Sequence, residues 1–160
     1  MRRPTSGHFD PRRRRVNLEL PDLLYDRSKL EAIFLPTGQM LQLDRVLHLH
    51  GNKLFAEFDV RSHWVFPMHF PSDPIFPGSL LVEAAGQAVA VWAWHAGLRG
   101  KPRMLRVAAK FKHPVLPGDD TVTLCAEVQQ RRNICLGNVE LSSGGRIVAE
   151  VRPMILVLPD

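Results

Sequence analysis

Two side chains that could transfer protons stand in the segment WVFPMHFPSDPIFPGSLLVEAAGQ, residues 64–87. The first is His69, within a proline-rich stretch, and the second is Glu83, fourteen positions later. Imidazole titrates near neutral pH, with an unperturbed pKa of about 6.5, so it can accept a proton under ordinary conditions. A carboxyl group in surroundings that exclude water favours its protonated form and can donate a proton. The pair is therefore a candidate for general acid–base chemistry.

Two neighbouring residues could support the same chemistry. Gly78 ends the proline-rich stretch, and its backbone N–H, at the beginning of a helix, could stabilise a developing negative charge. Gln87 lies one helical turn beyond Glu83, where its amide could orient the carboxylate. Each of these residues alone has a structural alternative, because a single loop histidine or helix glutamate is usually solvated or paired. Their combination at this spacing favours a site.

The elements that would hold these residues follow from apolar spacing and turn residues. The segment 80–96 has only three polar residues, and glycines bound it on both sides, which predicts a core helix. Residues 62–78 precede it and contain four prolines together with aromatic and histidine side chains, which predicts a functional loop. At seventeen residues the helix is shorter than the roughly twenty that span a bilayer.

Strands are predicted on both sides of this helix. Alternating apolar and polar residues over 40–50 and 53–61 indicate a hairpin that turns at Gly51-Asn52. A short helix over 20–34, with Asp22 as its candidate N-cap, precedes the hairpin. Four more strand-like segments come after the long helix, at about 103–112, 120–130, 133–142 and 146–158. The order predicts an α+β fold in which an antiparallel sheet covers one apolar helix.

The net positive charge of the chain lies in its first fifteen residues. The chain has a formal charge of +5, and residues 1–15 contain six arginines and one acid. Removing these from the 21 basic and 16 acidic residues leaves fifteen of each in the remainder. A neutral domain argues against nucleic acid as a partner. We expect residues 1–16 to be a disordered tail, and no apolar stretch follows the arginines as a secretory signal would require.

Cysteine and histidine spacing predicts no metal site. Cys125 and Cys135 fall on consecutive predicted strands, and a hairpin between them would place Cys125 opposite about position 139. We therefore expect two free thiols in a reducing compartment, which indicates a cytoplasmic protein. His48 and His50 alternate on one strand face, but no third ligand is evident near them.

The segment 64–87 resembles the active-site signature of the 3-hydroxyacyl-[acyl-carrier-protein] dehydratases, the FabA/FabZ family. The likeness rests on HF, a following DPIFPG turn, and an acid fourteen positions after the histidine. LPTGQMLQLDRV (35–46) and AAKFKHPVLPGD (108–119) extend the resemblance to about residues 35–157. It implies a single hot dog domain over 17–160, with a six-stranded antiparallel sheet wrapped around one long central helix. Glutamate at position 83 is similar to the FabZ branch, whereas Met68 replaces a commonly small residue.

The resemblance implies dehydration of a (3R)-hydroxyacyl thioester to a trans-2-enoyl thioester, without metal or organic cofactor. His69 would take the C2 proton, and Glu83 would protonate the departing hydroxyl. The N–H of Gly78 would stabilise charge on the thioester oxygen, with Gln87 supporting Glu83. The substrate would be carried on acyl carrier protein in fatty-acid, polyketide or polyene synthesis.

Two further sets of residues could contact the substrate or its carrier. The aromatic and methionine side chains around His69 could line an acyl tunnel, although core packing is the alternative. These candidates are Trp64, Phe66, Met68, Phe70 and Phe76. The run 99–112 has six basic residues and no acid, which could dock an acidic carrier protein or could be a solvated face. These candidates are Arg99, Lys101, Arg103, Arg106, Lys110 and Lys112.

The long helix is apolar almost all round, which one small sheet cannot cover. We therefore expect a two-fold homodimer or an assembly of dimers, with no membrane partner. The resemblance further implies that His69 of one subunit and Glu83 of the other share each active site. Two alternatives remain open at this point: a hot dog acyl thioesterase, which needs no such histidine, and a catalytically silent hot dog dimer partner.

Overall fold

The computed structural model of the chain describes residues 23–33 and 36–159. The expectations for the tail over 1–16 and for Asp22 as an N-cap fall outside these residues. The described chain forms one antiparallel sheet of seven strands in the order β1-β2-β3-β5-β6-β7-β4. The strands are β1 (Tyr25–Asp26), β2 (Arg45–His50), β3 (Lys53–Asp59), β4 (Lys101–Phe111), β5 (Thr121–Arg131), β6 (Ile134–Ser143) and β7 (Arg146–Leu158).

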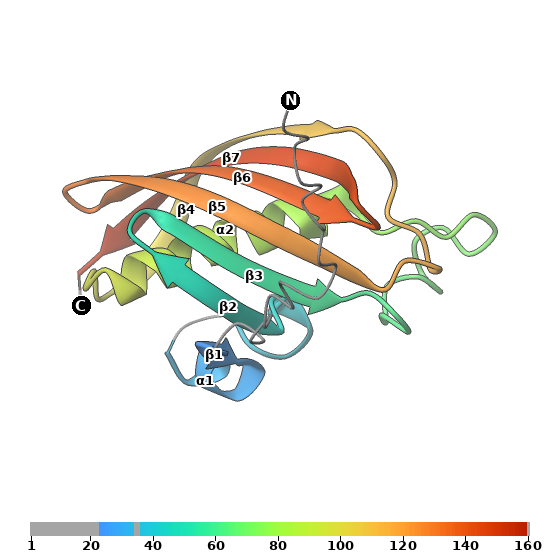
Figure 1. Cartoon of the computed structure of the whole chain (residues 1–160), viewed down its shortest axis with the longest axis horizontal. Coiled ribbons are helices and arrows are strands. Elements are labelled where there is room, and N and C mark those ends of the chain that lie inside the picture. The colour runs from blue at the N-terminus through green and yellow to red at the C-terminus, as the bar shows by residue number, and fades with distance from the viewer. Residues whose placement is uncertain (1–22, 34–35, 160) are drawn as a thin grey trace, which may run out of the picture.

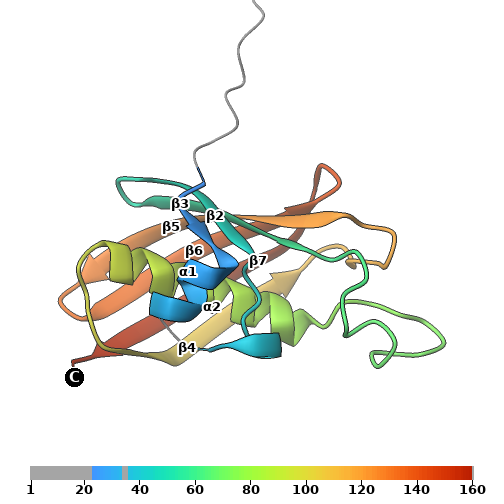
Figure 2. The same cartoon turned by 90° about the horizontal axis from the view of Figure 1, so that it is seen from below.

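The sheet curves around one long helix, α2 (Gly78–His95), which lies behind the strands in Figure 1. In Figure 2 the helix has β3 and β5 on one side and β4 on the other. This arrangement confirms the predicted α+β fold with a sheet wrapped around a central helix. The sheet has one strand more than the six expected, because the two-residue β1 pairs with β2 at its edge.

The helix can lie close to the sheet because both surfaces carry small residues at their contact. Ala84, Ala85 and Ala88 of α2 are fully buried. On β6, a Cβ atom added at Gly137 would lie 2.4 Å from the side chain of Val89, so the contact needs glycine on the strand. Close packing at this point holds α2 in a fixed position relative to the sheet.

The first helix is shorter than predicted over 20–34. It is α1 (Arg27–Ile33), and the residues just before it join the sheet instead, with Tyr25 paired to Val46. The Asp26 carboxylate accepts the backbone N–H of Lys29 at 2.9 Å, as an N-cap side chain does. The cap and the short strand together start the helix at residue 27.

The strand predicted over 40–50 is also shorter, since β2 begins at Arg45. A 3₁₀ turn, η1 (Gly38–Met40), and an irregular segment occupy its predicted beginning. The physical reason lies at Gln42, whose backbone N–H donates to the side-chain oxygen of Gln87 at 2.8 Å rather than to a neighbouring strand. The four later strands and their turns agree with the prediction, and Gly144 and Gly145 have the positive φ of a tight hairpin.

Both cysteines are free thiols, as predicted. Cys125 lies opposite Glu140, one position from the expected 139, and burial raises the pKa of both Cys125 and Cys135. His48 and His50 stack with 6.3 Å between ring centroids, and no group of three or more His, Cys, Asp or Glu side chains in 23–33 and 36–159 could hold a metal ion. Over the same residues no helix has both the length and the apolar character to span a bilayer.

Candidate active site

His69 lies in the long loop between β3 and α2, and its ring orientation is fixed by the backbone of that loop. The backbone N–H of Ile75 donates to the carbonyl of His69 at 3.0 Å, and Nδ1 of His69 lies 2.8 Å from the carbonyl oxygen of Ile75. Because a carbonyl oxygen can only accept, Nδ1 must carry the proton. In the neutral ring the other nitrogen, Nε2, therefore keeps its lone pair and is the nitrogen able to act as a base.

Glu83 lies in the second turn of α2, half-buried, where Gln87 fixes its carboxylate. Nε2 of Gln87 donates to Oε1 of Glu83 at 2.9 Å and to the carbonyl of Met40 at 2.7 Å. The oxygen of the same amide accepts the N–H of Gln42 at 2.8 Å. All three contacts fit only one orientation of the amide, so Gln87 always presents a donor to Glu83.

Glu83 lines two adjacent cavities, of about 210 and 560 Å³. The smaller cavity has an apolar wall that includes Gly86, Met104 and Ile155. Gly86 lets Met104 lie against the helix, since a Cβ at position 86 would be 2.6 Å from the methyl group of Met104. A carboxylate beside such an apolar wall could act on a polar group carried by an apolar chain.

Gly78 is the first residue of α2 and lines a different cavity, of about 560 Å³, with Phe76, Phe111 and His113. A Cβ at position 78 would lie 2.7 Å from the ring of Phe111. A side chain at position 78 would therefore require the ring of Phe111 to move. Phe111 is 53% exposed and forms an outer wall of this cavity.

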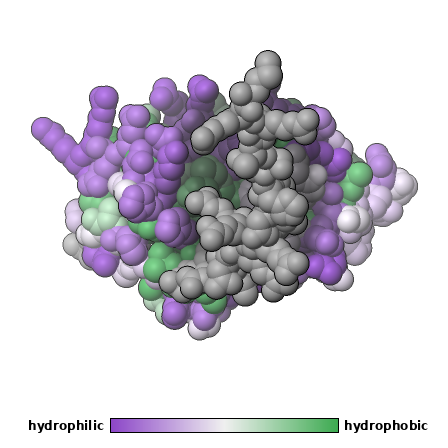
Figure 3. All heavy atoms as spheres, viewed as in Figure 1, coloured by the Kyte–Doolittle hydropathy of each residue, from purple (hydrophilic) through white to green (hydrophobic). Residues whose placement is uncertain are grey.

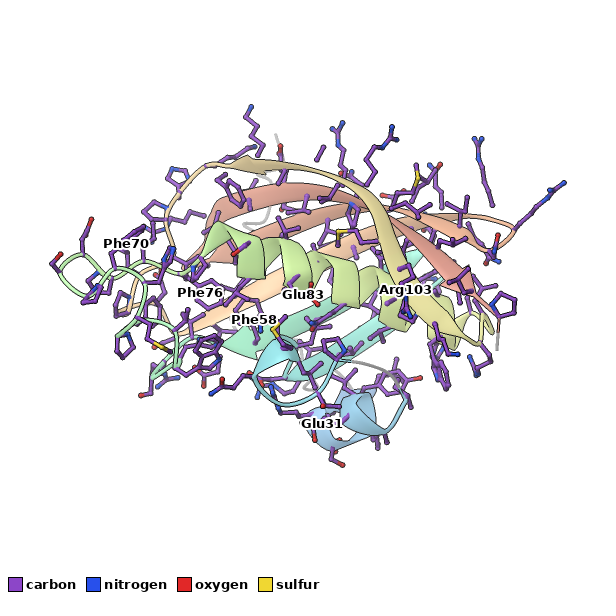
Figure 4. All side chains as sticks on the ribbon, turned by 180° about the vertical axis from the view of Figure 1, so that it is seen from behind. Glu31, Phe58, Phe70, Phe76, Glu83 and Arg103 are labelled. Atoms are coloured by element: carbon purple, nitrogen blue, oxygen red, sulfur yellow. The ribbon has the colours of Figure 1, made fainter. Side chains whose placement is uncertain are left out.

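His69 and Glu83 lie apart in the described chain. His69 is not among the residues that line the two cavities of Glu83. Phe70, whose ring centroid is 4.4 Å from that of His69, lies on a loop that projects past the beginning of α2, whereas Glu83 lies farther along the helix (Figure 4). The acid and the base of the candidate pair therefore face different parts of one chain.

The five acyl-tunnel candidates are dispersed. Phe66 and Phe76 are buried in the core, at 6% and 3% exposed, as the packing alternative expects. Met68 and Phe70 are 64% and 59% exposed on the projecting loop. Trp64 is half-buried and lines another cavity, beside His63. Phe66 and Phe76 contact each other, with 6.0 Å between their ring centroids, while Met68 and Phe70 lie apart from them on the loop.

The six carrier-docking candidates also differ in their surroundings. Lys101 and Arg103 line a cavity of Glu83, whereas Arg106 and Lys110 are exposed on β4. The guanidinium of Arg99 lies over the ring of Trp94, 4.2 Å from its centroid. Lys112 pairs with Glu150 at 2.5 Å, and this hydrogen bond lowers the pKa of Glu150.

Sequence reasoning did not find the backbone groups that orient the site. They are the carbonyl of Ile75 beside His69, and the carbonyl of Met40 and N–H of Gln42 beside Gln87. Backbone groups leave no mark in residue identity. The only available signal was the likeness of the segment 35–46 to the family pattern, which contains both Met40 and Gln42.

The comparisons with known proteins agree with this architecture. The chain belongs to the FabA-like domain family, whose model matches residues 35–152. Among solved structures, the dehydratase heterocomplex ApeI:P from Xenorhabdus doucetiae is similar, with a TM-score of 0.68 and 17% identity, over 82% of this chain and 91% of that one.

Two solved structures with other names also have a fold similar to that of this chain. A mutant of the phenylacetic acid degradation protein PaaI from Thermus thermophilus has a TM-score of 0.58 and 24% identity, over 74% of this chain and 95% of that one. A hypothetical thioesterase with coenzyme A from Streptococcus pneumoniae has a TM-score of 0.60 and 15% identity, over 72% of this chain and 85% of that one. At these identities the structures establish the fold alone, which is shared by proteins named as a dehydratase and as a thioesterase.

Proposed function

We propose that this chain is a (3R)-hydroxyacyl thioester dehydratase that acts on substrates carried by acyl carrier protein. The observation that carries the proposal is the contact between Nδ1 of His69 and the carbonyl of Ile75, which leaves Nε2 as a base. A thioesterase that works through a helix carboxylate has no need of such a histidine. Dehydration needs both a base and an acid.

In the proposed reaction Nε2 of His69 takes the proton from C2 of the substrate. The C2 electron pair forms the double bond to C3, and the C3 hydroxyl leaves as water with a proton from the carboxyl group of Glu83. Negative charge that develops on the thioester oxygen would be stabilised by the N–H of Gly78 at the positive end of α2. The cycle closes when the proton on His69 returns to Glu83 through solvent.

We further propose that two copies of the chain complete each site, with His69 from one and Glu83 from the other. The separation of the two residues within one chain supports this, and so does the exposure of β4 at the edge of the sheet. β4 is an edge strand, and every residue in it other than Pro102 is exposed. Leu105, Val107 and Phe111 are between 39% and 53% exposed along it. An exposed edge strand that carries these apolar side chains between its basic residues would be covered by pairing with a second copy.

The test is to incubate the protein with a 3-hydroxyacyl carrier protein and follow two products together. Appearance of 2-enoyl absorbance without free thiol supports dehydration. Release of free acid and carrier thiol would instead indicate a thioesterase. A chain that gives neither product, while still forming a dimer, would be a catalytically silent member of the family.

A further inference from the structure

The two cavities that Glu83 lines differ in how deeply their walls are buried. The smaller one, of about 210 Å³, has the buried residues Gly86 and Ile155 in its wall, and we call it the inner cavity. The larger one, of about 560 Å³, has the exposed residues Met40 and Lys101 in its wall, and we call it the outer cavity. The inner cavity thus lies between α2 and the sheet, whereas the outer cavity is closer to solvent.

The wall of the inner cavity suits a carbon chain better than a polar group. Apart from Glu83, only Gln87 and Arg103 bring polar side chains to it. The amide of Gln87 is occupied by Glu83, by the carbonyl of Met40 and by the N–H of Gln42. Arg103 is exposed, also lines the outer cavity, and donates from Nη1 to the carbonyl of the residue before it at 2.8 Å. An alkyl chain would therefore meet only apolar groups at the buried end of this cavity.

The inner cavity extends along α2 from Glu83 to Ala90, which also lines it. At the rise of an α-helix these positions are about 10 Å apart along the axis. In the proposed dehydration, on which this inference rests, C3 of the substrate lies at the carboxyl group of Glu83. The part of the acyl chain beyond C3 can then lie in the inner cavity, parallel to the helix.

Met104 of β4 reaches the helix between these two positions. A Cβ atom added at Gly86 would lie 2.6 Å from Cε of Met104, so the end of the methionine fills the space that a side chain at position 86 would take. Both residues line the inner cavity. A methionine side chain is unbranched and flexible, and its end adapts to the space around it. The size of the inner cavity therefore depends on where Met104 lies against Gly86.

We propose that Met104, held against Gly86, limits the inner cavity to short acyl chains. Met104 is the specificity-determining residue, since it would touch the end of the chain, and Gly86 is a positioning residue that acts through it. The volume supports short chains, because about 210 Å³ is below the roughly 300–1,000 Å³ of typical ligand pockets. A longer chain would have to displace Met104.

The experiment is a calorimetric titration of the full chain with pantetheine amides of straight saturated acids, from butanoyl to dodecanoyl. In these compounds an N–H replaces the thioester sulfur and no C3 hydroxyl is present, so neither dehydration nor thioester hydrolysis consumes them. Each methylene group that enters the inner cavity should tighten binding by about fourfold. We expect this gain to stop at the chain length that reaches Met104.

Two substitutions should move that limit in opposite directions. Met104→Ala removes three heavy atoms from the wall, so the gain should continue for about two more carbons. Gly86→Ala pushes the flexible end of Met104 away from the helix and into the cavity. The longest amide that the native chain accommodates should then bind at least about fourfold more weakly.

Two further variants are controls. In the double variant Gly86→Ala with Met104→Ala the added methyl group no longer meets Cε, so longer amides should bind again. Met154→Ala removes a half-buried methionine of β7 that lines neither cavity of Glu83, and it should leave the limit unchanged.

Three results would overturn the proposal. These are binding of none of the amides up to about 10 mM, native affinity that rises without a limit through the dodecanoyl amide, and the same limit in the native chain and Met104→Ala. If Gly86→Ala does not fold, Met104→Ala still decides. Dehydration with an unchanged limit in Met104→Ala would contradict this inference alone. A limit that Met104→Ala moves, in a chain that does not dehydrate, would support it and contradict only the proposed reaction.

Discussion

Gln87 holds Glu83 through an amide whose other contacts are all with the backbone of one short segment. The Nε2–Oε1 distance between the two side chains is 2.9 Å, and the same amide bonds to Met40 and Gln42. The position of the candidate acid thus depends on a turn far away in the sequence. The turn and the helix act as one unit around the carboxylate.

Replacing Gln87 with Met should therefore affect both stability and turnover. The N–H of Gln42 and the carbonyl of Met40 would lose a buried partner, at about 1–3 kcal/mol each. In the proposed reaction kcat should fall about tenfold with little change in KM, because Gln87 orients the acid without touching substrate. Urea denaturation and steady-state kinetics measure the two effects. Gln129→Leu, at an exposed glutamine on β5, is the control and should change neither.

His69→Ala and Glu83→Gln should each lower kcat by about 10²–10⁴-fold, the usual effect of losing a positioned base or acid. Neither side chain is in the buried core, so thermal unfolding should change little. Near-native dehydration by either variant would show that its proposed role is wrong.

A mixture of these two inactive variants tests the shared site. After refolding together, about half of the dimers would be mixed on random pairing. Each mixed dimer would have one site with both substitutions and one intact site, so activity should return to about a quarter of the native value per chain. If His69 and Glu83 act within one chain, every site has one lesion and no activity returns.

Gly78→Ala should lower stability, because the added methyl group would meet the ring of Phe111. We expect a small loss, below the roughly 1–3 kcal/mol of overpacking in a closed core, because the ring of Phe111 is half exposed and can move. Phe111→Leu in the same chain should relieve the clash and restore much of the stability. The double variant then separates packing from chemistry. Recovery of kcat with stability would mean that Gly78 serves packing alone, whereas a persistent defect in kcat would support close approach of the thioester to the backbone.

Substitution of Leu105 with Asp should separate the proposed dimer. The change places a charge in the middle of the exposed edge β4, where pairing with a second copy would bury it. Light scattering after size exclusion should show a shift from dimer to monomer together with loss of dehydration. Thr123→Asp, an exposed position on β5, is a control that should remain dimeric. A monomeric native chain would contradict the proposal directly.

Arg106→Glu with Lys110→Glu should raise KM for a carrier-bound substrate by about tenfold, since docking would be electrostatic. The two residues lie opposite the half-buried Met154 and Glu150 of β7, on the outer face of the sheet, which a strand paired to the edge of β4 would leave open. A small thioester mimic should be unaffected. Arg131→Glu, at the exposed end of β5, provides a charge control. Equal effects on the two substrates would argue against carrier docking on this strand.

The periodicity of apolar residues predicted the long helix and the long strands. The helix after Gly78 and the last four strands are long, with regular apolar spacing and glycine or proline at their ends, so local rules were enough. The boundaries of the first elements were harder to predict from the sequence, because α1 and β2 start where tertiary contacts place them. Tyr25 pairs with Val46, and Gln42 bonds to the side chain of Gln87.

The candidate site was likewise predicted only in part from the sequence. Residue types and spacing pointed to His69 and Glu83, since acid–base chemistry requires particular side chains. The protonation of His69 at Nδ1 depends on the carbonyl of Ile75, which no residue identity encodes. The exposure of Met68 and Phe70 depends on the path of a loop that local periodicity does not describe. The parts of the outer face that are coloured in Figure 3 are by contrast mostly hydrophilic, with some hydrophobic residues among them.

The position of β4 at the sheet edge has a consequence for folding. β4 follows α2 directly in the sequence, yet its only neighbour in the described sheet is β7, which is made after β5 and β6. During synthesis β5 can join the earlier strand β3, and β6 can then join β5, each as soon as it emerges. β4 must wait, with its apolar side chains uncovered, until β7 arrives. Such long-range closure is slow and leaves an intermediate that is prone to aggregate. The strand that the proposed dimer would use is thus also the one most open to wrong pairing while the chain is incomplete.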